Sequence, residues 1–241
     1  MSSSESSTPP MPKLKMSKLT NTIPEQLPEV PDLENPDYAA IAARALPLLK
    51  ERLDDYGYAH SLYAAQTARD LAVIYAAEGV DPQDAYLAAL LHDWDRGLDR
   101  ETLLAEATTI GIELTPEVLA APQILHAHTG AAQVKHIFPN TPDSIITAIR
   151  HHTVGDEDMD ALDKIIYIAD MIEPTRDSAI VHTLREQVGT VDLNTLFLQA
   201  YQATMLHLIH NRKVMHPRTT EVWNALIMKG MPTLDYHADN K

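Results

Sequence analysis

Residues 87–93 read Leu-Ala-Ala-Leu-Leu-His-Asp, an apolar run that ends on an adjacent histidine and aspartate. Leucine and alanine are strong helix formers, so the run indicates a buried helix segment. Two polar side chains at its end have two explanations. They form either a solvated helix C-terminus, where histidine is favoured, or a polar pair that carries chemistry. The rest of the chain decides between them.

The helical pattern extends on both sides of this run, from Asp37 to about residue 229. Alanine and leucine are abundant there, and we find no repeats and no series of strands. Asp81-Pro82 is a helix start signal, and Gly57 and Gly79 are typical of helix ends. The pattern predicts an all-α helical bundle with helices over 37–55 (with Pro47 as a potential break), 58–78, 82–94, 99–111, 124–137, 142–152, 159–173, 178–188, 192–212 and 217–229.

The first 36 residues have a different composition. They hold seven of the 16 prolines and six serines, with no aromatic residue and no glycine. Such a segment cannot bury enough apolar surface to offset its ordering entropy. We therefore predict a disordered N-terminal extension over 1–36, one folded domain over 37–230 and a short C-terminal tail over 231–241.

Composition limits the classes of function. The chain holds 34 acidic and 19 basic residues, a formal charge of −15, which argues against a broad nucleic-acid or membrane footprint. It has no cysteine, which excludes disulfides, thiolate metal sites and thiol nucleophiles. No apolar run reaches the roughly 18 residues of a membrane span, and no signal-peptide pattern is present. We expect a soluble cytoplasmic protein that binds no nucleic acid and no membrane.

Twelve histidines in a chain without cysteine require an explanation. Any one of them, taken singly, is explained as a core histidine with a satisfied hydrogen bond. Asp170 is different, because it lies inside the apolar stretch Ile165–Ile172, where an unpaired carboxylate is costly. Four imidazoles and two carboxylates at five predicted helices form the candidate set: His60, His92, Asp93, His126, His152 and Asp170.

Helical periodicity separates the two neighbouring histidines at 151 and 152. The positions three, four and seven residues before His152 are all apolar. The corresponding positions before His151 include Thr147 and Ser144, a more polar face. We therefore expect the side chain of His152 to point inward.

Imidazole and carboxylate donors together suit Fe, Mn, Zn or Ni, and a mixed nitrogen and oxygen set without thiolate argues against a structural zinc site. Six ligands exceed the needs of one ion that also binds water and substrate. The set therefore predicts two metal ions that share one carboxylate. Asp93 is the natural bridge, because its neighbour His92 would bind one of the same ions.

The order and spacing of these residues resemble the HD-domain metal-dependent phosphohydrolases. The surrounding motifs are more closely similar to the YqeK-type branch, which comprises bacterial symmetrical diadenosine tetraphosphate hydrolases. The resemblance covers about residues 46 to 229 and rests most strongly on the stretch Ile168-Ala169-Asp170-Met171-Ile172-Glu173-Pro174-Thr175-Arg176. The matching motifs lie at 90–93, 124–127, 149–155, 167–176 and 215–219.

The resemblance implies a helical fold, a di-iron centre and cleavage of the central bridge of diadenosine tetraphosphate to give two ADP. It places all six residues of the candidate set in the family's metal site. Iron is the expected metal, and the ligand chemistry leaves Mn, Ni and Zn open. Three positions depart from the family pattern: Gly57 replaces an arginine, Arg96 a lysine and His128 a proline. We expect His128 to be a surface residue or a neighbour of the ligands.

A polyphosphate carries several negative charges, so this acidic chain needs local cations to bind it. Two metal ions would supply that charge and activate the attacking water. Arg96 and Arg176 are candidate catalytic and phosphate-binding residues, and Thr153 is a candidate hydrogen-bond donor. The alternatives are that Arg176 caps a helix and that Arg96 pairs with Asp95 or Asp99. Trp94 is either a surface for a base or part of the site wall.

Two other functions compete with a dinucleoside polyphosphate substrate. The HD architecture also hosts hydrolysis of dNTPs, mononucleotides and cyclic nucleotides, and the metal ligands cannot separate these activities. A non-catalytic nucleotide-sensing module is the other alternative, and it predicts missing ligands, whereas all six are present. Long helices rich in alanine and leucine make a homodimer plausible, and the sequence leaves the oligomeric state open.

Overall fold

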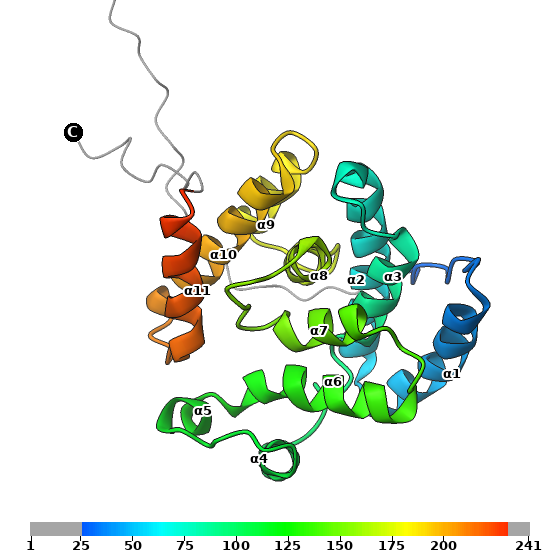
Figure 1. Cartoon of the computed structure of the whole chain (residues 1–241), viewed down its shortest axis with the longest axis horizontal. Coiled ribbons are helices and arrows are strands. Elements are labelled where there is room, and N and C mark those ends of the chain that lie inside the picture. The colour runs from blue at the N-terminus through cyan, green and yellow to red at the C-terminus, as the bar shows by residue number, and fades with distance from the viewer. Residues whose placement is uncertain (1–25, 231–241) are drawn as a thin grey trace, which may run out of the picture.

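The structure is a computed structural model in which residues 26–230 are described. Over that range the chain forms eleven α-helices and two short 3₁₀ helices, with no strand, so the predicted all-α class is confirmed (Figure 1). In chain order the elements are α1 (Pro36–Arg52), α2 (Asp55–Ile74), η1 (Ala76–Glu78), α3 (Pro82–Leu91), α4 (Arg100–Thr109), α5 (Pro116–Ala120), η2 (Pro122–Leu125), α6 (His126–Ile137), α7 (Asp143–His151), α8 (Ala161–Ile172), α9 (Ala179–Gln187), α10 (Leu193–His210) and α11 (Pro217–Met228).

Side-chain caps fix where the first helices begin. Asn35 caps α1 by accepting the backbone N–H of Asp37 at 3.0 Å. Pro47 lies inside α1 without ending it. Gly57, expected at a helix end, lies in the first turn of α2, because Asp54 accepts its backbone N–H at 2.7 Å and starts the helix there. The predicted gap between the first two helices is therefore misplaced by a few residues.

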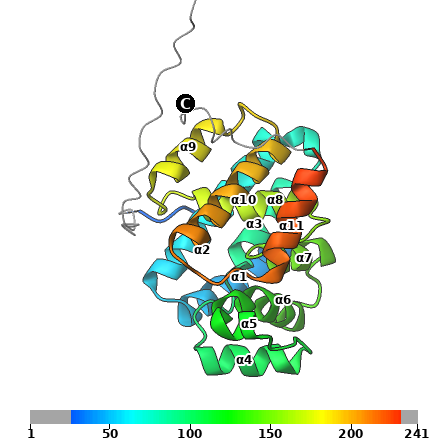
Figure 2. The same cartoon turned by 90° about the vertical axis from the view of Figure 1, so that its left-hand side faces the viewer.

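Helix α8 is the centre of the molecule. It packs against α2, α3, α7, α9 and α10, which surround it in Figure 1. Its apolar face is fully buried, with Ile165, Ile168 and Ala169 at zero exposure. Figure 2 shows α10 lying across the same core from the side. A central helix of this kind can hold a polar residue such as Asp170 only where the neighbouring helix ends supply partners.

A smaller apolar cluster lies beside the main core. Ala107 of α4, Val118 of α5 and Leu125 of η2 form it, and it holds the segment that leads directly into α6. Helix α5 and the 3₁₀ turn after it were not predicted from the sequence, because each is a single short turn. In Figure 1 these elements form the lower edge of the molecule.

Part of the predicted extension contacts the helical body. The Tyr63 hydroxyl on α2 donates to the Gln26 carbonyl at 2.6 Å. The Asn35 backbone N–H donates to the Gln83 side chain on α3 at 2.9 Å. Residues 1–25 and the predicted tail 231–241 lie outside the described residues. Within 26–230, no helix has both the length and the apolar character that a membrane span requires.

Candidate metal centre

Five helix ends and helix faces bring the six candidate residues together. His60 lies on α2, His92 and Asp93 follow the last residue of α3, and His126 begins α6. His152 follows α7, and Asp170 lies near the end of α8. The four histidines and Asp93 are buried, whereas 27% of the Asp170 side chain is exposed. The polar pair at residues 92 and 93 therefore faces the interior and is not a solvated helix C-terminus.

Asp93 lies between two histidine pairs. Its Oδ1 is 2.9 Å from Nε2 of His126 and 3.5 Å from Nε2 of His152. Its Oδ2 is 3.6 Å from Nε2 of His60 and 3.5 Å from Nε2 of His92. Each oxygen of this carboxylate therefore faces a different pair. Asp170 adds a second carboxylate to one side only, with its Oδ1 3.0 Å from Nε2 of His60.

The tautomer of three of these histidines follows from the contact that the Nδ1 atom makes. Nδ1 of His92 contacts the Ala89 carbonyl at 2.6 Å, and Nδ1 of His152 contacts the Ile149 carbonyl at 2.7 Å. Nδ1 of His126 contacts the carbonyl of Gln123 in the same way. A carbonyl oxygen only accepts, so each Nδ1 carries the hydrogen. In the neutral ring the Nε2 atom then presents a lone pair to the centre of the site.

The Nε2 atoms of the four histidines face one another in pairs. Nε2 of His126 is 3.0 Å from Nε2 of His152, and Nε2 of His60 is 3.2 Å from Nε2 of His92. The lone pairs of His126 and His152 repel at this separation unless a cation lies between or beside them. The buried groups formed by His60, His92 and Asp93 and by Asp93, His126 and His152 therefore fit divalent metal ions, which imidazole and carboxylate donors bind.

Electrostatics at the site favour cations. Burial raises the pKa of Asp93, but the surrounding histidines outweigh it and hold this pKa well below its usual range. Burial lowers the pKa of His92 to about 4, so this ring is neutral. For His60, burial lowers the pKa, but hydrogen bonds to Asp170 and Glu173 reverse the effect and raise it to about 9. A positive charge beside Nε2 of His60 is therefore stabilised, whether it comes from a proton or a metal ion.

Comparisons with known proteins agree with this geometry. Residues 57–175 match the family model described as HD domain. A protein of Halalkalibacterium halodurans named bis(5'-nucleosyl)-tetraphosphatase, symmetrical, is 33% identical over 188 residues, which span 77% of this chain and 97% of that protein. A Bacillus subtilis protein of the same name is 32% identical, over 76% of this chain and 96% of its own length.

The chain belongs to the HD-domain family. A solved structure agrees with this assignment: a chain from Clostridium acetobutylicum, described as a predicted HD superfamily hydrolase involved in NAD metabolism, superposes with a TM-score of 0.72. It is 33% identical and covers 78% of this chain and 97% of its own length. The resemblance recognised in the sequence is therefore confirmed, including its tetraphosphatase branch.

The HD-domain centre has a supporting carboxylate that was not among the predicted site residues. Glu173 is fully buried, and its Oε1 accepts from Nδ1 of His60 at 3.0 Å. The backbone N–H and the hydroxyl of Thr175 both donate to Glu173. Tyr56 stacks on His60 with ring centroids 6.3 Å apart. The position of Glu173, three residues after Asp170 at a helix end, was the signal available in the sequence.

Arg185 holds the turn that carries this carboxylate. It lies on α9 and donates to three backbone carbonyls, those of Ile172 at 2.7 Å, Glu173 at 2.5 Å and Arg176 at 2.9 Å. The Ile172 carbonyl belongs to the last residue of α8, and those of Glu173 and Arg176 lie in the turn after it, so the guanidinium joins the helix end to this turn. The turn that positions Glu173 and Arg176 is therefore tied to α9.

The turn that carries Asp93 is tied to α1. Arg52, the last residue of α1, donates to the Trp94 carbonyl at 2.9 Å and forms an ion pair with Asp95. A Cβ atom at residue 97 would lie 2.2 Å from the Arg52 carbonyl oxygen, so only Gly97 permits this approach. Asp95 therefore pairs with Arg52 and not with Arg96.

The remaining aromatic and histidine candidates lie off the centre. Trp94 is 1% exposed and packs edge-on against Phe138, with ring centroids 5.6 Å apart, so it belongs to the core and neither lines the pocket nor offers a surface for a base. Nδ1 of His151 contacts Asp163 on α8 at 3.0 Å, whereas His152 faces Asp93. His128 is half-buried, and its burial lowers its pKa to about 4.

Two arginines and a threonine lie at the pocket beside the centre. Arg96 is exposed, its Nη1 lies 3.4 Å from Nδ1 of His126, and no ion pair to it occurs in the range 26–230. Arg176 donates to Asp170 Oδ1 at 2.7 Å. The Thr153 hydroxyl is buried there without a hydrogen-bond partner in the described part of the chain. Asp99, the other expected partner of Arg96, instead caps α4.

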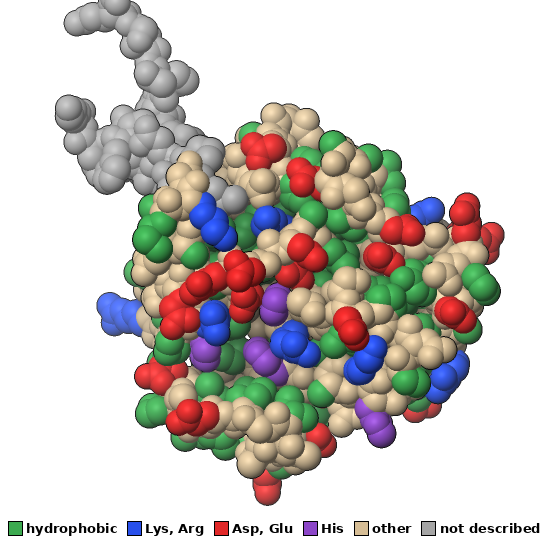
Figure 3. Space-filling view, viewed as in Figure 1, with side chains coloured by type: hydrophobic (Ala, Val, Ile, Leu, Met, Phe, Trp, Pro, Cys, Tyr) green, Lys and Arg blue, Asp and Glu red, His purple; other side chains and the backbone are tan. Residues whose placement is uncertain are grey.

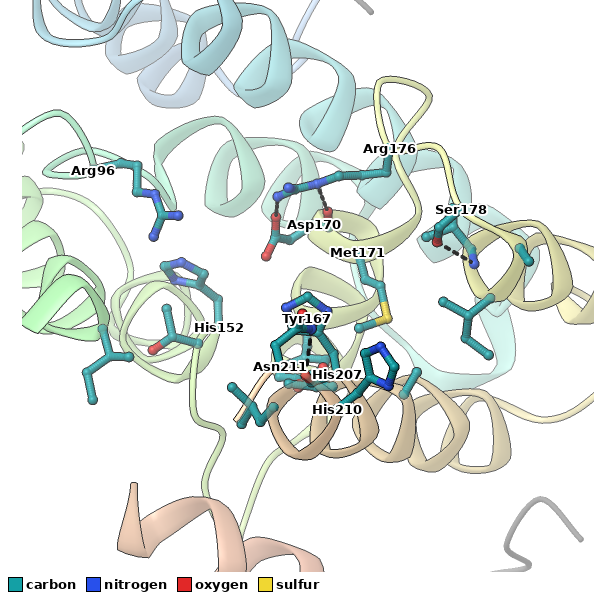
Figure 4. Close-up of a pocket in the computed structure, with 18 of the residues that line it drawn as sticks. Arg96, His152, Tyr167, Asp170, Met171, Arg176, Ser178, His207, His210 and Asn211 are labelled. Carbon is teal, nitrogen blue, oxygen red and sulfur yellow. Dashed lines mark hydrogen bonds and ion pairs between the residues drawn. The ribbon is translucent and has the colours of Figure 1, made fainter. Parts of the chain in front are cut away.

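The pocket of about 590 Å³ begins at the metal centre and continues between α8, α9 and α10. Figure 4 shows Arg96 and His152 on one side and Met171, His207 and Asn211 on the other. Figure 3 shows a group of histidine and cationic side chains near the centre of this face, over α6 and α7, with acidic side chains beside it. Local positive charge therefore exists despite the net charge of −15.

Proposed function

We propose that this protein hydrolyses diadenosine tetraphosphate symmetrically and releases two ADP. The observation that carries the proposal is the position of Asp93, with one carboxylate oxygen toward each histidine pair. The names of the relatives, symmetrical bis(5'-nucleosyl)-tetraphosphatases matched over nearly their whole length, support the same substrate.

The proposed centre holds two ions, with iron expected and Mn, Ni or Zn as alternatives. His60, His92 and Asp170 would hold one ion, His126 and His152 the other, and Asp93 both. When bound, such a pair neutralises phosphate charge and activates water. The carbonyl and carboxylate partners of the four Nδ1 atoms keep the rings oriented for this role.

The chain's own cations then position the polyphosphate. Arg96 has no carboxylate partner among the described residues, so its guanidinium can bind phosphate oxygens directly. Arg176 is paired with Asp170, so it both orients that carboxylate and adds positive charge to the pocket. The buried Thr153 hydroxyl lacks a hydrogen-bond partner within residues 26–230, and a phosphate oxygen would satisfy it.

The bond change in the proposed reaction is simple. Water attacks one of the two inner phosphorus atoms, and the bond from that phosphorus to the central bridging oxygen breaks. The oxygen leaves with the second nucleotide, so each product is ADP, and the proton of water is released. The products are symmetrical when the centre binds the two inner phosphates and water attacks one of them. Attack at an outer phosphorus would give AMP and ATP.

Chromatography of the products at early time tests the proposal. Diadenosine tetraphosphate is incubated with the purified protein and iron or manganese under reducing conditions, beside a panel of dNTPs, mononucleotides and cyclic nucleotides. We expect ADP as the sole product and slow or no turnover of the panel. Equal AMP and ATP, or turnover of a mononucleotide alone, would contradict it and favour the other HD-type activities.

The homodimer and the cytoplasmic location stay predictions. Light scattering of the purified protein measures the first, and fractionation of cells measures the second. Neither is needed for the chemistry proposed above, because all six candidate ligands come from one chain.

A further inference from the structure

The pocket changes character along its length. At the metal end its charged and metal-binding side chains are those of Arg96, Arg176, His126, His152 and Asp170, beside Ile124 and Thr153. The far wall, formed by α9, α10 and the side chains of Tyr167 and Met171 on α8, contains no Lys, Arg, Asp or Glu among its lining residues. Its apolar floor includes Met171, Ile180 and Leu208, each half-buried. A ligand that matches both ends is anionic at one and uncharged at the other.

His207 stands on this far wall with its ring held in place. It is exposed, and Asn211, one helical turn later, has its Nδ2 atom 3.2 Å from Nδ1 of His207 and donates at 2.8 Å to the His207 carbonyl. An amide nitrogen donates, so Nδ1 of this ring accepts and Nε2 carries the hydrogen. An exposed side chain that is already ordered loses little entropy when a ligand packs on it.

We infer that the far wall is a nucleobase subsite, in which a base lies on the floor formed by Met171, Ile180 and Leu208 and packs against the imidazole of His207. The inference rests on the proposed function, since it places the base of one nucleotide half there while its phosphates meet Arg96 and Arg176. The volume of about 590 Å³ is ample for a nucleotide. Asn211 is a positioning residue, because it acts through the histidine ring.

Two probes that differ only in the base test the subsite. ADP and ribose 5-diphosphate are titrated calorimetrically into the metal-loaded protein and into its His207→Ala, Asn211→Ala and Ile209→Ala variants. Ile209 is the matched control, because it lies on the same helix turn, is 62% exposed and does not line the pocket. Melting curves check that each variant is folded.

We expect His207→Ala to weaken ADP binding roughly 5- to 150-fold, the range given by loss of a base-stacking contact, and to leave ribose 5-diphosphate unchanged. Asn211→Ala should weaken ADP binding less, and Ile209→Ala should have no effect. Unchanged ADP affinity in the folded His207 variant, or an equal loss for both probes, would overturn the inference. Equal affinity of the wild-type protein for ADP and ribose 5-diphosphate would also overturn the inference. Because binding is measured without turnover, failure to cleave diadenosine tetraphosphate would overturn only the proposed function.

Discussion

The four histidines of the metal centre are buried and held by hydrogen bonds, whereas the far wall on α9 and α10 is half-open to solvent. Each histidine of the centre has its second nitrogen fixed by a carbonyl or by Glu173. On the far wall, His207 depends on a single side chain, Asn211. Substitution at the first end disturbs a connected network, while substitution at the second changes one contact. Substitutions at the metal centre should therefore reduce metal binding and activity strongly, whereas substitutions on the far wall should change mainly the affinity for the ligand.

The largest effect should come from Asp93→Ala, because this carboxylate faces both histidine pairs. We expect hydrolysis of diadenosine tetraphosphate to fall about 1,000-fold or more, beyond the 10- to 100-fold typical of an outer partner of a ligand. Metal content should fall at the same time, as measured by elemental analysis of protein purified without chelator. Full metal content together with full activity in this variant would contradict the bridging role.

The neighbouring histidines at 151 and 152 offer a matched pair. His152→Ala removes a side chain that faces Asp93, so bound metal should fall by about half or more and activity with it. His151→Ala removes a contact to Asp163 and should keep the metal content. The opposite pattern in metal analysis would mean that the ligand is His151.

A smaller loss is expected from Glu173→Ala, which leaves all six candidate ligands in place. Without this carboxylate, Nδ1 of His60 loses its acceptor, and the ring is free to rotate. We expect metal affinity to fall about 10- to 100-fold, measured by competition with a chelator. Glu173→Gln keeps an oxygen acceptor and should recover part of the affinity. Equal affinities in the three proteins would exclude an orienting role.

Arg96→Ala tests the phosphate contact at the mouth of the pocket. Loss of one charge-assisted hydrogen bond should raise KM or lower kcat about 10-fold, depending on whether the contact already exists in the ground state. Arg150→Ala is the control, because Arg150 is exposed and does not line the pocket. Steady-state kinetics that change equally in both variants would point to a general effect of surface charge.

The smallest effect should follow removal of the N-terminal residues. A chain that begins at Gln26 should keep its rate within about twofold, because the contacts of the described segment remain. A chain that begins at Pro36 loses the hydrogen bond from Tyr63 to the Gln26 carbonyl, the bond from Asn35 to Gln83 and the Asn35 cap of α1, and should be less stable by about 2–3 kcal/mol. Urea unfolding and a rate assay measure the two quantities. A large loss of rate on removal of residues 1–25 would show that they take part in the reaction.

The features that could be predicted from the sequence are those that depend on local patterns of residues. Periodicity and start signals placed most helices, and the apolar positions before His152 indicated that it, and not its neighbour, points inward. The expectation of a helix end at Gly57 was wrong, because a glycine in the first turn of a capped helix has the same local sequence as one at a helix end. The partners of Arg52 and of Glu173 lie 43 and 113 residues away, and no local pattern announces contacts at such separations.

Arg52 joins the end of α1 to the turn that carries Asp93, and this connection has a thermodynamic consequence. A ligand that stabilises the Asp93 turn must also oppose local detachment of α1, since the two share the hydrogen bond to the Trp94 carbonyl and the ion pair with Asp95. Amide hydrogens of α1 should therefore exchange more slowly when the centre is occupied, although α1 supplies none of the candidate ligands. The first helix of the domain thus reports, by its protection from exchange, on the state of a centre that it does not touch.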